Sequence, residues 1–242
     1  DHFGEQLSPI PAMMAAADAT TTLKVGALVH DNDYKHPVVL AKEIATIDVL
    51  SGGRTEFGLG AGWMRTDYDQ SGIPYDEPKV RVDRFEEGLA ITKRLLSGET
   101  VTHAGEHYTI TGMPGTPRCV QSPHPPILIG GGGKRMLTIA AREADIIGVN
   151  PQIKSGAVDL EAAKDSTAEA FDRKVGWVRE AAGDRMDDIE LNLLVLFFMV
   201  TSSFIDEPRM APVPYTITVP GDDEKVFTLS VEGTYLLRDG DK

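Results

Sequence analysis

Residues 126–150 read PILIGGGGKRMLTIAAREADIIGVN, and this stretch decides the fold. It opens on an apolar run at 127–129, which is typical of a buried strand. Glycines fill positions 130–133, a helical pattern of apolar residues follows, and a second apolar run occupies 146–149. Strand, glycine turn, helix and strand in this order predict a βαβ unit with parallel strands.

The glycine run predicts a phosphate-binding turn. It consists of Gly130, Gly131, Gly132 and Gly133. Glycine lets backbone N–H groups approach a ligand closely, and these groups would lie at the start of a helix, where the helix dipole is positive. Lys134 and Arg135 follow directly and could add a local basic pocket. A tight strand-to-helix turn without any ligand is the alternative, and the residues alone leave both open.

Neither familiar nucleotide-binding fingerprint is satisfied. A P-loop would need a glycine where Leu128 stands and a hydroxyl where Arg135 stands. A second glycine cluster, at 58–62, approaches the dinucleotide pattern G-x-G-x-x-G, but the third glycine falls on Trp63 or, when the pattern starts at Gly60, on Arg65. The phosphate-binding turn is therefore of another kind.

Composition limits the functions that the chain can have. With 24 Lys and Arg against 37 Asp and Glu, the net charge of the 242 residues is −13, which argues against general binding to nucleic acid or to anionic membranes. Cys119 is the single cysteine, so no internal disulfide framework can form, and a cytoplasmic setting is the simplest. No apolar run reaches the roughly 18 residues of a membrane span.

Apolar patterns along the chain alternate between strand and helix. Strands are expected over 23–29, 54–60 and 189–200, and helices over 11–22, 37–51, 82–96 and 160–182, with a β-rich excursion at 100–122. This alternation predicts parallel strands joined by helical crossovers. Because the strands are apolar throughout, both sheet faces should be covered. A (β/α) barrel and a doubly wound sheet both fit.

The alternation of strand and helix patterns ends after residue 200. The segment 204–214 holds three prolines, and 213–219, 225–231 and 234–237 predict short alternating strands separated by turns. We therefore expect two parts, an α/β core over 1–200 and a proline-rich linker with an antiparallel β meander over 201–242.

Polar clusters elsewhere support neither a metal site nor a hydrolase. His30, Asp31, Asp33 and His36 gather after a strand, but Lys35 occupies the third ligand position of a calcium loop, so a polar active-site loop is the better interpretation. His103 and His107 are expected on a surface hairpin. The serines lack the G-x-S-x-G pattern of a hydrolase nucleophile. No metal ligands are predicted.

Several motifs in order carry a family resemblance over about residues 1–200. They are DHFG at 1–4, HPVVLAKE at 36–43, LSGGR at 50–54, GLGAGW at 58–63, RVDRFEE at 81–87 and PPILIGGG at 125–132. Together they resemble the luciferase-like monooxygenase superfamily and, within it, the deazaflavin-dependent (coenzyme F420) oxidoreductases. The resemblance implies a TIM-like (β/α) barrel with its site at the C-terminal ends of the strands.

The resemblance also implies roles for particular residues. His2 matches a histidine beside the reactive face of the cofactor, which can exchange a proton near neutral pH, and Asp1 could orient it. Ala27 and Leu28 match a bulge at a strand end, often with a non-prolyl cis bond, that supports the cofactor ring. The ring's side would be lined by Gly60, Ala61, Gly62 and Trp63. The cofactor phosphate would lie on Gly130, Gly131, Gly132 and Gly133.

Two departures from the family pattern are expected to matter. The family has a strand, a helix and most of a second strand before the matching DH pair, and it closes with an eighth strand that residues 201–242 do not resemble. We therefore expect a barrel incomplete at both ends, as in a fragment or a recombined member of the family. An open barrel exposes sheet edges, which the meander or a partner could cover.

These observations favour an oxidoreductase that transfers a hydride between reduced deazaflavin (F420) and a small organic substrate. The alternatives are a luciferase-like monooxygenase that uses FMN and a non-catalytic barrel that serves as an assembly or binding module. The expected partners are a small-molecule substrate and a second copy of the chain in a homo-oligomer such as a dimer, with no nucleic acid or membrane.

Overall fold

The structure is a computed structural model that describes residues 1–193, 215–218 and 226–229. The chain divides into a large unit, which holds every element up to the strand that ends at Leu193, and a small unit, which holds the last two strands. Each unit is described by itself.

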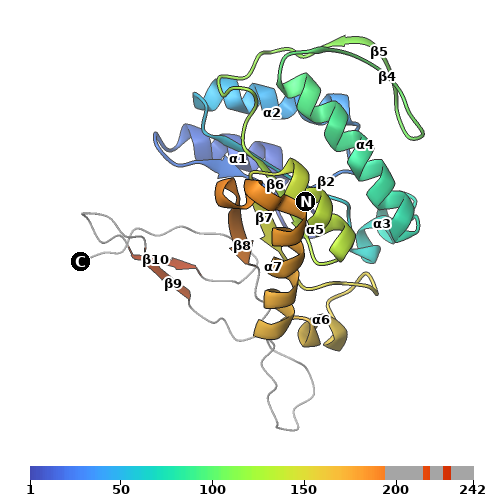
Figure 1. The fold of residues 1–242 in the computed structure, drawn as a ribbon. Helices are drawn as coiled ribbons and strands as arrows, with labels where there is room; N and C mark the ends of the chain where they lie inside the picture. Colours follow the sequence, from blue (N-terminus) through green and yellow to red (C-terminus); the bar gives the residue numbers. More distant parts are fainter. Residues whose placement is uncertain (194–214, 219–225, 230–242) are drawn as a thin grey trace. The chain divides into compact units, whose positions relative to one another are not determined.

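A parallel sheet forms the centre of the large unit (Figure 1). Its strands are β1 (Val25–Gly26), β2 (His30–Asp31), β3 (Thr55–Gly60), β6 (Ile127–Gly131), β7 (Ile146–Val149) and β8 (Glu190–Leu193). The strand order is β1-β3-β6-β7-β8, and β2 pairs with the C-terminal end of β3. Every pairing among these six strands is parallel, which confirms the βαβ prediction. In the described residues, the hydrogen-bonded sheet does not close into a ring.

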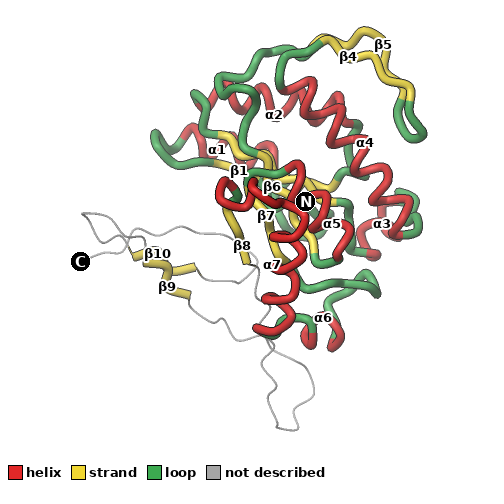
Figure 2. Tube along the Cα trace, viewed as in Figure 1, coloured by secondary structure: helices red, strands yellow, loops and turns green. Residues whose placement is uncertain are grey.

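Helices connect the strands and cover the sheet (Figures 1 and 2). They are α1 (Pro9–Asp18), α2 (Pro37–Ser51), α3 (Arg65–Ser71), α4 (Pro78–Leu96), α5 (Lys134–Glu143), α6 (Leu160–Lys164), α7 (Ala168–Ala182) and the 3-10 helix η1 (Gly183–Asp188). Proline stands at the start of α1, α2 and α4, where its fixed φ favours the first turn and its missing N–H costs nothing. The left-handed Gly52 ends α2, as predicted.

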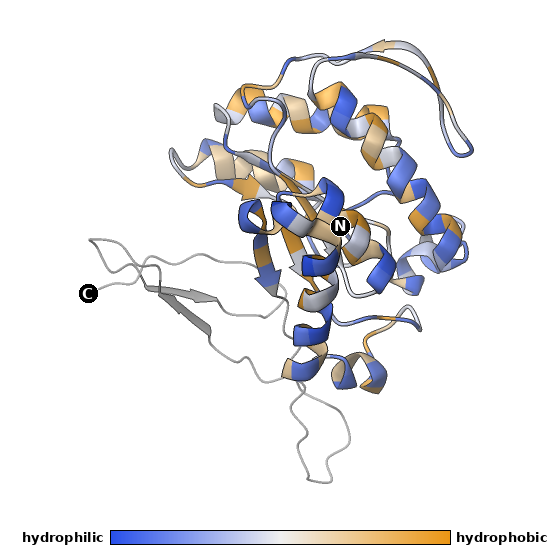
Figure 3. Ribbon diagram, in the orientation of Figure 1, coloured by the Kyte–Doolittle hydropathy of each residue, from blue (hydrophilic) through white to orange (hydrophobic). Residues whose placement is uncertain are grey.

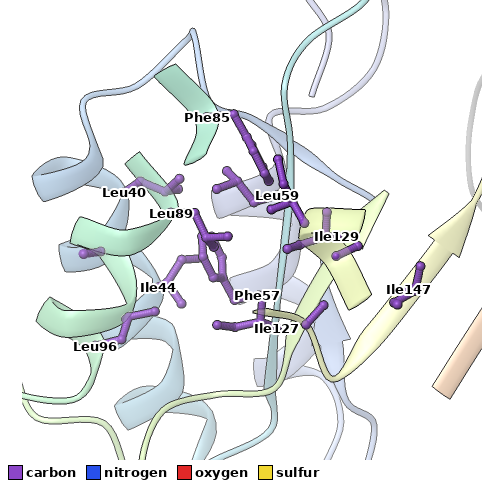
Figure 4. Packing of buried hydrophobic residues seen from close by; sticks show 14 of the residues in the cluster. Leu40, Ile44, Phe57, Leu59, Phe85, Leu89, Leu96, Ile127, Ile129 and Ile147 are labelled. Carbon is purple, nitrogen blue, oxygen red and sulfur yellow. The ribbon is translucent and has the colours of Figure 1, made fainter. Parts of the chain in front are cut away.

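The core lies between the sheet and the helices α2 and α4 (Figure 4). Figure 4 shows Leu40 and Ile44 of α2 with Leu89 of α4 pointing towards the side chains of Phe57 and Ile127 from the sheet. All five residues are almost completely buried. Burial of an aliphatic or aromatic side chain of this size stabilises the fold by about 1.5–3 kcal/mol. Along α4, hydrophilic and hydrophobic residues alternate as expected for a helix with one buried face (Figure 3).

A two-stranded hairpin follows α4, as the β-rich excursion at 100–122 predicted. It comprises β4 (Thr100–Ala104) and β5 (Thr109–Pro114) in antiparallel pairing. One carboxylate on α4, Glu87, accepts hydrogen bonds from the ring of His103 at 2.8 Å, from the His107 amide at 3.0 Å and from the Tyr108 amide at 2.9 Å. The two histidines therefore lie on a hairpin, and the ring of His103 fastens that hairpin to α4.

Two strands of the small unit are described. They are β9 (Tyr215–Thr218) and β10 (Val226–Leu229), and they pair antiparallel, which confirms the first two strands of the predicted meander. The strand predicted over 234–237 and the turn between β9 and β10 lie outside the described residues. So does the remainder of the strand predicted over 189–200, beyond β8.

The segment 160–182 is mostly helical, as predicted, and is divided into α6 and α7. The division arises because the Thr167 side chain accepts from the Ala170 amide and starts a new helix, while Ser166 bonds back to Ala162. The segment 1–3, where the resemblance implies the end of the second barrel strand, forms no strand. Its only backbone link in the described residues joins the Asp1 amine to the Val29 carbonyl at 3.0 Å, and one bond does not make a ladder.

Among the described residues, none of the helices combines the length and the apolar character that crossing a bilayer would require.

Candidate functional site at the carboxyl ends of the strands

The C-terminal ends of the parallel strands meet at one edge of the sheet, and the predicted site residues lie there. Asp31 ends β2, Gly60 ends β3, Gly131 ends β6 and Val149 ends β7. In parallel α/β folds this edge carries the loops that bind ligands. Its two halves, at β2–β3 and at β6–β7, are built in different ways.

His2 forms a short hydrogen bond at the β2–β3 half. Its Nδ1 lies 2.6 Å from Oδ2 of Asp67, a residue of α3, and its ring meets the ring of Trp63 edge-on at 5.5 Å between centroids. Because a carboxylate can only accept, the Nδ1 of His2 must carry the hydrogen. Nε2 is then the free nitrogen of the neutral ring, and a quarter of the side chain is exposed. His2 is thus held in one tautomer with one nitrogen left for chemistry.

Asp67 is the partner that the sequence did not reveal. It is buried, and besides His2 it accepts hydrogen bonds from the Tyr34 hydroxyl at 3.1 Å and the Phe3 amide at 3.4 Å. The sequence suggested Asp1 for the orienting role. In the structure the Asp1 carboxylate instead lies 3.8 Å from Nδ1 of His30, whose ring is fully buried.

A tyrosine–carboxylate cluster, defined as Asp31, Asp33, Tyr34, Asp67 and Tyr68, surrounds this pair. The Tyr68 hydroxyl lies 3.1 Å from Asp31 and 3.0 Å from Asp33, and the Asp33 amide donates to Asp31 at 2.8 Å. Burial raises the pKa of Asp31 to about 6, and burial raises the pKa of Tyr68 as well. The polar loop predicted after β2 therefore forms a buried network of hydroxyl donors and carboxylate acceptors.

Arg84 of α4 closes the cluster on its outer side. Its guanidinium donates to Asp33 at 2.7 Å and to Asp76 at 2.8 Å. The hydrogen bond to Asp33 and the neighbouring negative charges raise the pKa of Arg84, so it stays charged. Beyond Arg84 lies a cavity of about 290 Å³. It is lined by Asn32, Asp33, Lys35, His36, Ile73, Pro74, Asp76, Arg84 and Tyr108.

The predicted bulge at Ala27 and Leu28 interrupts the strand between β1 and β2. The cis peptide bond joins Leu28 to Val29, one residue beyond the expected position. The bulge packs closely against β3. A Cβ on Gly58 of β3 would lie 1.9 Å from the Ala27 carbonyl oxygen, and one on Gly60 would lie 2.7 Å from Cγ2 of Val29. The Leu28 side chain is 56% exposed, which leaves an apolar group free at the site.

The loop of Gly60, Ala61, Gly62 and Trp63 lies against the tyrosine–carboxylate cluster. Gly62 has a φ of +74°, and a Cβ there would approach the Tyr68 hydroxyl to 1.8 Å and Asp31 to 2.6 Å. Only glycine fits this close approach in the left-handed region. Ala61 packs against the core, and Trp63 carries the contact to His2.

The β6–β7 half is made of backbone. In the glycine run (130–133), Gly130 and Gly131 belong to β6, and Gly133 precedes α5. A Cβ on Gly130 would contact Val29 at 3.7 Å, so the bulge joins the two halves of the site. A Cβ on Gly132 would lie 2.6 Å from the backbone of Pro151, so this position has no room for a side chain.

Backbone amides at the glycine run are available to a ligand. Within residues 1–193, the structure gives the amides of Gly132, Gly133 and Lys134 no acceptor, whereas the Asn150 amide donates to Gly131 and the Leu137 amide to Gly133. Free N–H groups at a helix start favour anions, because they add to the positive end of the helix dipole.

The two basic residues after the glycine run do not supply a basic pocket. Arg135 is engaged by Asp83 and Glu86 of α4 at 2.5 and 3.3 Å, and Lys134 lies 3.8 Å from Glu180 of α7. Attraction for an anion at this end of the sheet must therefore come from the amides. Among the described residues, none of the His, Cys, Asp and Glu side chains form a group of three or more that could hold a metal ion.

A parallel α/β sheet with a candidate site at its carboxyl edge fits a TIM-like (β/α) fold, as predicted, and equally a doubly wound sheet, so the family match decides for the TIM-like fold. The chain belongs to the luciferase-like monooxygenase family, whose family profile matches residues 1–183. The predicted resemblance is therefore confirmed for the large unit.

Two relatives are similar to the large unit of this chain. The chain is 32% identical over 186 residues to the 5,10-methylenetetrahydromethanopterin reductase of Archaeoglobus fulgidus, which covers 75% of this chain and 51% of the relative. It is 30% identical over 145 residues to the FMNH2-dependent dimethylsulfone monooxygenase of Pseudomonas putida, covering 60% of this chain and 39% of the relative. The chain thus spans about half, or less, of the length of these relatives.

The solved structures agree with this fold. The coenzyme F420 dependent tetrahydromethanopterin reductase from Methanopyrus kandleri superposes with a TM-score of 0.66 at 24% identity, covering 80% of this chain and 55% of that chain. FMNH2 stands in the name of the Pseudomonas relative, and coenzyme F420 stands in that of the Methanopyrus structure.

Proposed function

We propose that this chain binds a reduced deazaflavin of the F420 type at the carboxyl edge of its sheet and serves in hydride transfer to a small organic substrate. The observation that carries the proposal is the placement of a fixed histidine tautomer, His2 on Asp67, at the same edge as the three free amides of the glycine run. When bound, the deazaflavin ring would supply the hydride.

The residues present fit such a cofactor. Its phosphate would be held by the amides of Gly132, Gly133 and Lys134, because a run without side chains admits an anion to the helix start. The ring would rest against the exposed Leu28 of the bulge and beside the loop that ends at Trp63. The bulge contacts the glycine run through Val29 and Gly130, which supports one continuous binding surface.

His2 has a defined part in this proposal. Asp67 holds hydrogen on Nδ1, so a protonated Nε2 would donate the proton that balances hydride transfer to the substrate, and in the reverse direction Nε2 would accept it. Trp63 limits the movement of the His2 imidazole from one side, with 5.5 Å between the two ring centroids. Asp67 itself is fixed by Tyr34, so it orients His2 without touching substrate.

FMN is the second candidate cofactor. One relative carries FMNH2 in its name, and the anion site would accept the single phosphate of FMN equally well. A non-catalytic barrel that acts as a binding module is the third. We also propose a homo-oligomer, most simply a dimer, because in the described residues the sheet has open edge strands at β1 and β8.

Anaerobic titration of the purified chain separates these candidates. We expect F420 to bind with a lower Kd than FMN, followed by the change in absorbance of each cofactor. Size-exclusion chromatography of the same sample gives the oligomeric state. Binding of FMN without binding of F420 would contradict the deazaflavin proposal, and a chain that binds neither would favour the non-catalytic module.

A further inference from the structure

Lys174 of α7 is a buried cation that the chemistry proposed above does not use. Its side chain is almost wholly buried, which is rare for lysine unless its charge is paired. The ammonium donates to the carbonyl of Asn150 at 2.7 Å and to Oδ2 of Asp165 at 2.5 Å. Burial lowers the pKa of Lys174, so the fold retains this group at a cost.

Both contacts lead to one short segment. Residues 150–152 follow β7, and Lys174 binds the carbonyl at the start of this segment. The same oxygen of Asp165 that meets Lys174 accepts the amide of Gln152 at 2.8 Å, at the end of the segment. Lys174 and Asp165 therefore fasten the segment at both ends.

The fastened segment lies directly on the glycine run. A Cβ on Gly132 would lie 2.6 Å from the Pro151 backbone and 2.7 Å from the Asn150 carbonyl oxygen. A Cβ on Gly133 would lie 3.3 Å from Nε2 of Gln152. Any shift of residues 150–152 would therefore change the space above Gly132 and Gly133, the residues whose amides are free.

We propose that Lys174 is a positioning residue for the anion site, which it shapes by holding residues 150–152 against Gly132 and Gly133. The inference rests on the proposed function, since it assigns the cofactor phosphate to these amides. Lys174 does not touch the phosphate. Its nearest polar partners are the Asn150 carbonyl and Asp165, and Asp165 is shared with Arg173 at 3.0 Å.

A comparison of cofactor pairs in which one member lacks the phosphate tests this role, and FMN and riboflavin are the pair that differ in phosphate alone. We would measure the Kd of FMN and of riboflavin, and of F420 and its phosphate-free chromophore, for wild type and Lys174→Met. Methionine keeps the apolar stem and removes the donor. For whichever pair wild type binds, we expect the advantage of the phosphate-bearing member to fall about tenfold, as for one lost charge-assisted hydrogen bond. The Kd of the phosphate-free member should stay unchanged.

The matched control is Lys164→Met. Lys164 is exposed on the neighbouring helix α6 and pairs only with Glu161 among the described residues, so it removes the same charge without releasing residues 150–152. We expect its phosphate advantage to equal that of wild type. Should Lys174→Met fail to fold, Asp165→Asn weakens the same anchor and decides the question in the same way.

Hydrogen exchange on wild type gives a second readout. FMN or F420 should slow exchange at Gly132, Gly133 and Gln152, and the phosphate-free molecules should not. Equal loss of affinity for both members of a pair in Lys174→Met, or no loss, would overturn the inference alone. A wild-type chain that binds none of the four molecules would overturn the proposed function and the inference with it.

Discussion

The β2–β3 half and the β6–β7 half of the site occupy the same edge of one sheet but are made of different material. At β2–β3, titratable side chains converge, with His2 and the tyrosine–carboxylate cluster joined by hydrogen bonds. At β6–β7, the glycine run offers backbone amides, and its two basic neighbours are engaged elsewhere. The side chains of the β2–β3 half can exchange protons, while the amides of the β6–β7 half provide fixed dipoles.

This difference has energetic consequences. The stability of a cluster of buried carboxyl groups depends on pH, because burial removes the water that would otherwise solvate the ionised form of each group. Amides do not titrate, so binding at the glycine run should depend on shape and on the positions of residues 150–152. Three substitutions, taken in order of expected effect, test whether chemistry and binding are divided between the halves in this way.

Asp67→Asn should have the largest effect. An amide can donate to Nδ1 as well as accept from it, so His2 loses its fixed tautomer. We expect kcat for oxidation of the reduced cofactor to fall about 100-fold or more, the usual contribution of a positioned acid or base, with an unchanged Kd for the cofactor. Nitrogen NMR of His2 should show mixed tautomers. Asp69→Asn, an exposed neighbour on α3, is the control. An unchanged kcat would refute the role of Asp67.

Asp31→Asn should alter stability as a function of pH. The pKa of Asp31 is raised from 3.8 to about 6 in the folded state, so its contribution to stability is complete below about pH 3.8 and is lost as the pH rises through about 6. Wild type should therefore lose about 3 kcal/mol of unfolding free energy between pH 4 and 7 that the variant does not lose. Urea unfolding measures this, with the exposed Asp18→Asn as control. Parallel curves for wild type and Asp31→Asn would contradict the prediction.

Gly132→Ala should weaken cofactor binding without affecting His2 and Asp67 in the other half of the site. The added methyl would meet the Pro151 backbone at 2.6 Å, and the displaced segment would disturb about one charge-assisted bond to phosphate, so Kd should rise about ten- to 100-fold. Gly176→Ala on α7 is the matched control, because nothing lies within 4 Å of the new Cβ. That control should bind normally and gain about 0.5–1 kcal/mol in stability. Equal Kd values for the two variants would show that the glycine run is only a turn.

The sequence predicted the parts of the fold that depend on short-range patterns. Apolar runs placed β3, β6 and β7, and proline and glycine placed the ends of α2. It missed the break between α6 and α7, because Ser166 and Thr167 interrupt the helix through side-chain hydrogen bonds and no glycine or proline marks the place. Apolar periodicity carries no information about such local competition.

For the candidate site, the sequence was informative about features formed by a single continuous segment. The glycine run was found at the strand edge because it is a local motif, and the bulge was placed there by the family resemblance. Asp67 was missed, since it meets His2 across 65 positions, and Lys174 was missed, since it meets Asn150 across 24. Pairings of this kind depend on how helices pack on the sheet, which one sequence does not reveal. The roles assigned to His2, Asp1 and the glycines stay predictions.

Glu87 gathers three hydrogen bonds from the β4–β5 hairpin, one from the ring of His103 in β4 and two from the amides of His107 and Tyr108 in the turn. A single carboxylate thereby acts as a reversible cross-link between a helix and a protruding arm, in the way that a disulfide does in secreted proteins. Attachment of the arm therefore depends on α4, on the ring of His103 and on the backbone amides of His107 and Tyr108.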